Sequence, residues 1–308
     1  MSGLCTYNYA DEVMERARFF QTVHAWPIAD VFNYTGWMAN FSAGEEQCLA
    51  AHILDFFTYY PATIVDKSLR TCIGSAGHYV SRKLTDWKHS NLRDRCYYSY
   101  IPGENPHSAD SGHLFSRKLR DEGGIPEQFI IKYEDISKVL GPLKEPTALI
   151  LVDDFVGTGN QCVKAWKKNT FPDIGITLEQ FSKATGHIFV YATLVANKLG
   201  YDRILRGCIG LHLSAVYVLG DEYNLFNPDC TCWKKDAGLF KEGVSLILDK
   251  SSKVGIPSTD GKDVRDEKGF GKQGLALAFH HGAPDAIPAF FYWCQNGWTP
   301  LIQKRYER

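Results

Sequence analysis

The sequence is most informative at residues 149–161, Leu149-Ile150-Leu151-Val152-Asp153-Asp154-Phe155-Val156-Gly157-Thr158-Gly159-Asn160-Gln161. An apolar run of strand length ends at two adjacent carboxylates, and a glycine-containing turn then leads into a segment, residues 162–166, that can form a helix. A continuous apolar run is typical of a strand buried on both faces, as in a parallel sheet. Ligands of such sheets bind beyond the carboxyl ends of the strands, so we expect this loop at the ligand-binding edge.

The residue types in the loop predict a particular ligand. Gly157 and Gly159 let the backbone approach a ligand closely, and the free N–H groups at the start of a helix attract a phosphate. Asp153 and Asp154 would repel a phosphate, so we expect them to bind sugar hydroxyls or a divalent cation. A ribose phosphate meets both requirements. The alternative is an ordinary Asp-Asp pair at a strand end of an unrelated α/β fold.

This order of residues resembles the signature of the type I phosphoribosyltransferases, an apolar strand, two acids and a Thr-Gly-x-Thr turn. Asp153 and Asp154 match the acidic pair, and Thr158 and Gly159 match the start of the turn. Gln161 stands where the family usually has a second hydroxyl, which changes one phosphate contact. The resemblance implies an α/β fold with a phosphoribosyltransferase-like parallel sheet flanked by helices. It also implies that residues 157–161, Gly157, Thr158, Gly159, Asn160 and Gln161, bind the substrate, and that Asp153 and Asp154 hold Mg²⁺ directly or through water.

A second anion site is predicted between the apolar run 96–101 and the helical stretch 113–121. Ser111 and Gly112 would lie at the entrance of that helix, and in the family this loop holds pyrophosphate. Arg117 and Arg120 lie one helical turn apart and could reach the phosphates, or they could be surface arginines. Lys132, at the end of a strand expected over 128–133, is a further candidate.

The C-terminal part contains a strand expected over 274–279, followed by His280 and His281 and by an aromatic block at 290–293. Histidine can act as a general acid or base near neutral pH, so we expect one of the pair in the active site under an aromatic cover. The His-His-Gly-x-Pro turn, with Trp-Thr-Pro-Leu at 298–301, resembles the PRTase-CE proteins of prokaryotic conflict and antiphage systems. That resemblance implies an effector that acts on nucleotides or nucleic-acid ends.

The distribution of helical patterns and apolar runs along the chain predicts two domains. Helical patterns at 9–22, 45–57 and 62–84 indicate a helical subdomain over 1–90, which either supports the sheet or binds a protein partner. Residues 91–308 alternate apolar runs with helical segments, as βαβ units do, and we expect a phosphoribosyltransferase-like domain with a C-terminal cover segment. The expected strands are 96–101, 128–133, 148–152, 187–195 and 215–219. A capping box is predicted at Ser42 and Glu45.

Composition narrows the functional classes. The chain has 308 residues, 44% of them hydrophobic, and a net charge of −1, so no global field attracts nucleic acid or an anionic membrane. No apolar stretch is long enough to span a bilayer, and we expect a cytoplasmic protein. Nine scattered cysteines suit reduced thiols, and Cys230-x-Cys232 is a weak zinc candidate.

These observations predict a glycosyltransferase of the pentosyl type. It would bind phosphoribosyl pyrophosphate or a nucleotide and make or break the bond at C1 of ribose. Two alternatives stay open: a non-catalytic sensor of such a ligand that regulates a partner, and a hydrolase of N-glycosidic bonds. The sequence does not identify the acceptor base.

Overall fold

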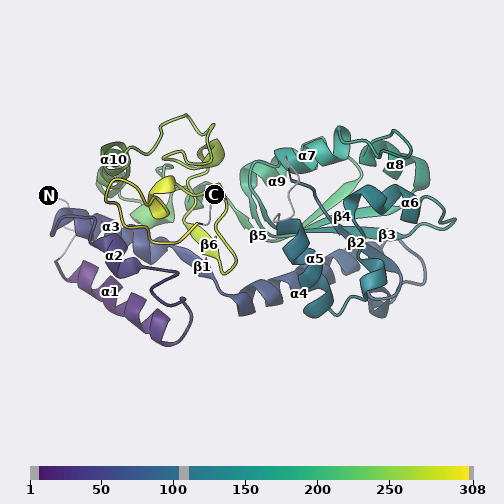
Figure 1. The fold of residues 1–308 in the computed structure, drawn as a ribbon, viewed down its shortest axis with the longest axis horizontal. Helices are drawn as coiled ribbons and strands as arrows, with labels where there is room; N and C mark the ends of the chain where they lie inside the picture. The colour runs from purple at the N-terminus through teal and green to yellow at the C-terminus, as the bar shows by residue number, and fades with distance from the viewer. Residues whose placement is uncertain (1–6, 104–110, 305–308) are drawn as a thin grey trace. The chain divides into compact units, whose positions relative to one another are not determined.

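The computed structural model describes residues 7–103 and 111–304. The chain forms two compact units. The first unit combines Met1–Ala62 with Gly220–Arg308, and the second consists of Thr63–Leu219 (Figure 1).

The first unit joins the two ends of the chain. Its elements are α1 (Tyr7–Thr22), α2 (Tyr34–Met38), α3 (Glu45–Phe56), β1 (Thr58–Tyr60), α10 (Ala237–Lys253) and β6 (Leu277–Phe279). β1 and β6 pair in parallel, with Thr58 opposite Leu277, and so connect segments more than two hundred residues apart. The helices predicted at 9–22 and 45–57 are present, but the predicted capping box is not: Gly44 is the N-cap of α3, and Glu46 accepts the Ser42 N–H at 2.7 Å.

Aromatic rings fill the core of the first unit. Phe291 contacts Trp37 and Phe57, with ring centroids 6.0 and 5.0 Å away. Phe290 and Phe291 are fully buried, so these two members of the predicted aromatic cover pack in the core instead. Such contacts also explain why the compact units differ from a division into 1–90 and 91–308, since the C-terminal segment packs with the N-terminal helices.

The second unit is a four-stranded parallel sheet in the order β2-β3-β4-β5. The strands are β2 (Cys96–Tyr100), β3 (Ala148–Val156), β4 (Ile188–Asn197) and β5 (Leu211–Leu219). Residues Ala148–Val152 are buried, as the continuous apolar run predicts for a central strand. The predicted class, a parallel α/β sheet flanked by helices, is confirmed.

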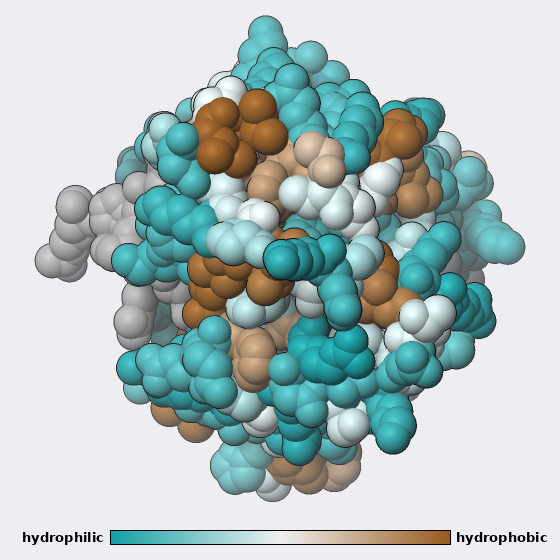
Figure 2. Space-filling view, turned by 90° about the vertical axis from the view of Figure 1, so that its right-hand side faces the viewer, coloured by the Kyte–Doolittle hydropathy of each residue, from teal (hydrophilic) through white to brown (hydrophobic). Residues whose placement is uncertain are grey.

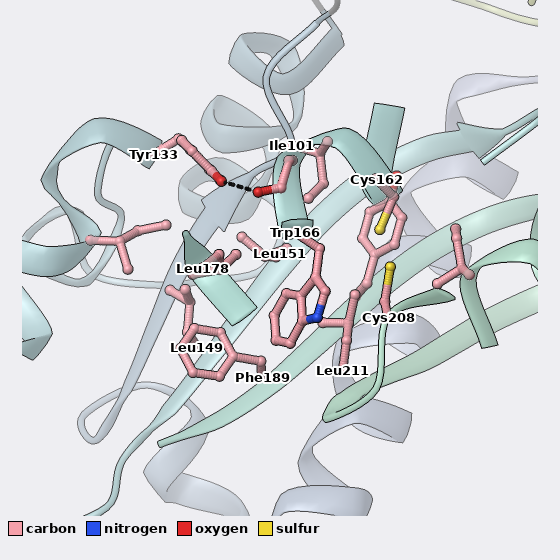
Figure 3. Packing of buried hydrophobic residues seen from close by; sticks show 14 of the residues in the cluster. Ile101, Tyr133, Leu149, Leu151, Cys162, Trp166, Leu178, Phe189, Cys208 and Leu211 are labelled. Carbon is pink, nitrogen blue, oxygen red and sulfur yellow. Dashed lines mark hydrogen bonds between the residues drawn. The ribbon is translucent and has the colours of Figure 1, made fainter. Parts of the chain in front are cut away.

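Helices cover both faces of this sheet. Figure 1 shows α7 (Asn160–Lys167), α8 (Leu178–Thr185) and α9 (Lys198–Gly207) on one side, and α4 (Ala62–Ser81) and α5 (Ser111–Asp121) on the other. The short α6 (Ile136–Leu140) precedes β3. On the α7 side Trp166 packs among Leu149, Leu151 and Phe189 (Figure 3). Tyr133 donates to the carbonyl of Ala165 at 2.7 Å, which satisfies its buried hydroxyl.

Two strand predictions need correction. Residues 128–133 form no strand: Glu127–Phe129 and Tyr133–Asp135 are 3₁₀ turns, and Ile130 makes only an isolated parallel bridge to Tyr98. The two turns leave only residues 130–132 between them, which is too short for a ladder, so one strand rather than two precedes β3 in the sheet. β3 itself continues through the acidic pair to Val156 instead of ending at Val152.

The cysteines and the surface add little to the fold. Seven described cysteines are free, and all but Cys294 are buried. None of the helices within 7–103 and 111–304 combines the length and the apolar character needed to cross a bilayer. On the face in Figure 2, hydrophobic surface (brown) is broken into separate patches by hydrophilic surface (teal).

Candidate functional site

The candidate site begins with the acidic pair in β3. Asp153 is 5% exposed, and its carboxylate accepts the Tyr191 hydroxyl at 2.8 Å and the Asp154 N–H at 2.9 Å. Tyr191 comes from the neighbouring strand β4, and its side chain is itself buried. Asp154 is only partly buried. The two acids therefore differ in their access to solvent, and Asp154 is the better placed to meet a ligand.

The environment of Asp153 favours its protonated form. Burial, the charge of Asp154 and a hydrogen bond to that side chain raise the pKa of Asp153 well above its usual range. The hydrogen bonds from Tyr191 and from the Asp154 backbone act in the opposite direction. Two carboxylates this close resist simultaneous ionisation, so a cation or a hydroxyl donor beside them would be stabilising.

The loop between β3 and α7 is held by contact between backbones. Gly159 has φ 74° and ψ 0°, a left-handed conformation that glycine adopts without strain. A Cβ on Gly159 would lie 2.8 Å from the carbonyl oxygen of Gly200, near the start of α9. A Cβ on Gly200 would overlap the carbonyl oxygen of Gly157. The glycines at both positions thus allow α9 to support the loop closely.

The N–H groups at the start of α7 are arranged as an anion site requires. The hydrogen bond from the Val163 N–H to the Gly159 carbonyl is 3.1 Å, so the N–H groups that precede Val163 have no carbonyl within the helix to bind. The Asn160 N–H reaches the Thr158 hydroxyl at 3.4 Å, a long contact that an acceptor from a ligand could replace. The prediction of residues 157–161 as a phosphate-binding loop is compatible with this geometry and stays a prediction.

Gln161 connects this loop to the end of β2. Its Nε2 donates to the carbonyl of Ile101 at 3.3 Å and to that of Pro102 at 3.0 Å. Residues 104–110, which include most of the predicted pyrophosphate loop, lie outside the described residues. The side chain at the position of the family's second hydroxyl therefore ties the predicted phosphate loop to the residues that follow β2.

The candidates around the second loop have different surroundings. Ser111 begins α5, and Gly112 is buried so closely against Tyr100 that a Cβ would lie 2.5 Å from the ring. Arg117 is exposed, while Arg120 donates to Asp121 at 2.8 Å and lies 4.0 Å from Glu127. Lys132 is exposed and precedes a 3₁₀ turn. It does not lie at the end of a strand, because the strand expected at 128–133 does not form. Phosphate binding by these three cations stays a prediction.

The histidine pair belongs to the first unit, whereas the acids belong to the second. The Nδ1 atoms of His280 and His281 lie 3.4 Å apart, and the His281 ring stacks on Phe279 with centroids 5.2 Å apart. Both side chains are partly exposed just after β6. A catalytic role for either histidine stays a prediction.

Sequence reasoning missed three residues beside the loop. Tyr191 binds Asp153, Gly200 packs against the loop, and Arg203 donates from α9 to the Thr158 carbonyl at 2.8 Å. The only local signal was Asn197, which caps α9 by accepting the Leu199 N–H at 2.9 Å, directly after an apolar strand. This cap marks a second strand-to-helix turn at the same edge of the sheet as the acidic loop.

Comparison with known proteins gives one result. The PRTase-CE family model matches residues 34–304, which is most of the chain and includes both the acidic loop and the histidine pair. No curated protein and no solved structure matched. The parallel sheet, the acidic strand end and this match lead to the same conclusion: the chain belongs to the PRTase-CE family and is phosphoribosyltransferase-like.

Proposed function

We propose that this protein binds a 5-phosphoribosyl ligand and makes or breaks the bond at C1 of the ribose, as a glycosyltransferase of the pentosyl type. The observation that carries the proposal is the β3–loop–α7 arrangement within a PRTase-CE chain. It puts an acidic pair three residues before a glycine turn, and that turn leads into a helix. An antiviral-defence role is part of the proposal and follows from the family resemblance alone.

N–H groups and carboxylates of the site would bind different parts of the ligand. N–H groups around Gly159 and the first turn of α7 would bind the 5-phosphate, because they combine free donors with the positive end of the helix dipole. Asp154 would accept hydrogen bonds from the ribose hydroxyls. Asp153, which is buried next to it, would hold the Asp154 side chain in position. As positive charge builds on the sugar in the transition state, the nearby carboxylates would stabilise it, so no nucleophilic side chain is needed.

Magnesium is a proposed cofactor. The described residues contain no cluster of three His, Cys, Asp or Glu side chains fit to hold a metal. Mg²⁺ commonly takes only one or two carboxylates from the protein and completes its shell with waters and substrate phosphates, so Asp154, backed by Asp153, fits this chemistry. When bound, it would neutralise charge on the pyrophosphate.

The test compares Asp154→Asn with Asp229→Asn, an exposed carboxylate in the other unit. Each protein is incubated with Mg²⁺, phosphoribosyl pyrophosphate and a panel of bases, or with Mg²⁺ and nucleotides, and released pyrophosphate and free base are measured. We expect Asp154→Asn to lose at least about 100-fold in turnover with unchanged thermal unfolding, and Asp229→Asn to retain activity. Full turnover in Asp154→Asn would refute the assignment.

A non-catalytic sensor is the second candidate, and the contacts of Gln161 favour it. Its amide is used to tie two loops together instead of offering a hydroxyl to the phosphate. Calorimetry with phosphoribosyl pyrophosphate and Mg²⁺ separates the candidates: tight binding without turnover on any base or nucleotide favours the sensor. Release of free base and ribose 5-phosphate from a nucleotide, with no transfer, would instead indicate a hydrolase.

A further inference from the structure

Arg203 of α9 makes its described polar contacts with the loop between β3 and α7. Its Nη1 donates to the Thr158 carbonyl at 2.8 Å and also to the side-chain oxygen of Asn160. Among the described residues no carboxylate lies within ion-pair distance of Arg203, and the nearby Asp202 is paired with Lys198. A partly buried guanidinium with no ion-pair partner among the described residues therefore lies next to the predicted phosphate loop.

The contact with Thr158 fixes the direction of a donor. In a trans peptide the C=O and the following N–H point in opposite directions. Arg203 binds the Thr158 carbonyl, so the Gly159 N–H of the same peptide points in the direction opposite to that carbonyl. Without that contact the peptide could rotate, because both flanking positions, Thr158 and Gly159, lie in an irregular turn.

The packing of α9 does not depend on this side chain. Ile204 is fully buried in the core of the second unit, and Gly200 is buried against the loop. These neighbours hold the helix on the sheet, whereas Arg203 extends to the loop from a partly exposed position. Replacing it should change the conformation and charge of the loop more than the stability of the fold.

We propose that Arg203 is a positioning residue that holds the 157–160 loop in its anion-binding conformation and supplies positive charge to a bound phosphate ester. This inference rests on the proposed function for the identity of the ligand. It adds a long-range cation, from the next βα unit, to a loop that has lost the family's second hydroxyl at Gln161. A charge-assisted hydrogen bond contributes enough for its loss to weaken binding on the order of 10-fold.

The experiment measures binding of ribose 5-phosphate and of ribose to Arg203→Gln, Arg203→Lys and Arg206→Gln by calorimetry at low and high salt. Arg206 is the matched control, an exposed arginine one turn later in α9. We expect Arg203→Gln to weaken ribose 5-phosphate about 10-fold or more and to bind it with less dependence on salt, because one nearby charge is gone. Arg203→Lys should recover part of the affinity, and Arg206→Gln should stay within about 2-fold of the wild type.

Three outcomes separate the possibilities. If the wild type binds ribose 5-phosphate and Arg203→Gln binds it equally well, the inference is refuted while the proposed function stands. If Arg203→Gln loses affinity with unchanged salt dependence and Arg203→Lys restores nothing, the role is structural and the inference also falls. If the wild type binds neither ribose 5-phosphate nor phosphoribosyl pyrophosphate, the proposed function is refuted. The inference is then refuted too, because it rests on that function.

Discussion

A single methyl group at Gly200 should disable the loop that we propose binds phosphate. Gly200 is buried in the first turn of α9, where an added Cβ would overlap the Gly157 carbonyl oxygen. The same Cβ would lie 2.8 Å from the Gly159 nitrogen and 2.9 Å from a methyl carbon of Val156. Because the interior is closely packed, the loop or the helix must retreat by roughly 1 Å to accept it.

The effects on stability and on binding should differ in size. Alanine is favoured over glycine in a helix by about 1 kcal/mol, whereas overpacking costs about 1–3 kcal/mol. The free energy of unfolding should therefore fall by only about 0–2 kcal/mol in Gly200→Ala. A displacement of roughly 1 Å in groups that position a ligand can cost about 100-fold, so binding of ribose 5-phosphate should nearly disappear.

The matched control is Gly74→Ala, in the interior of α4. No atom lies within 4 Å of a Cβ built there, so the substitution should stabilise the protein by about 0.5–1 kcal/mol and leave binding unchanged. Urea unfolding gives the stabilities and calorimetry gives the affinities. If Gly200→Ala binds ribose 5-phosphate as the wild type does, the close support of the loop by α9 is not needed for binding, and the reasoning is wrong.

Two further predictions concern buried titratable groups. Burial and the charge of Asp154 raise the pKa of Asp153. The folded protein should therefore lose stability as the pH rises from about 4 through the folded pKa of this group. Urea unfolding should show a smaller loss of stability over that pH range in Asp153→Asn. Equal pH slopes for the two proteins would contradict this. Burial and Lys234 lower the pKa of His52 from 6.5 to about 4, and neither ring nitrogen has a hydrogen-bond partner. Between pH 6.5 and 4 His52 is protonated in the unfolded chain but neutral in the folded protein, so roughly 3 kcal/mol of stability should be lost as the pH falls over that range. His52→Phe, which keeps a ring stacked on Tyr9, should remove most of that loss, and a variant as acid-sensitive as the wild type would show that another group causes it.

Local patterns predicted the central part of the fold. The apolar run 148–152 became the first part of β3, and the glycine turn and α7 follow it as expected, because a strand buried on both faces has a distinctive sequence; the acids, expected after the strand, lie within it. The run 128–133 looks similar in composition, yet it forms 3₁₀ turns with a single bridge to β2. Apolar character alone does not separate a strand from a short segment that packs beside one.

The part of the site that sequence reasoning missed lies in the next βα unit. β3 and β4 are neighbours with Val156 opposite Ala196, so the turns that follow the two strands must lie side by side at one edge of the sheet. The Asn197 cap and Gly200 are visible in the sequence, but only the strand order brings them to the phosphate loop. Arg203 follows from the same placement, since a residue about one turn beyond Gly200 in α9 can reach the Thr158 carbonyl. Arg203 thus contacts the loop from more than forty residues away along the chain, and no motif read along the sequence contains that relation.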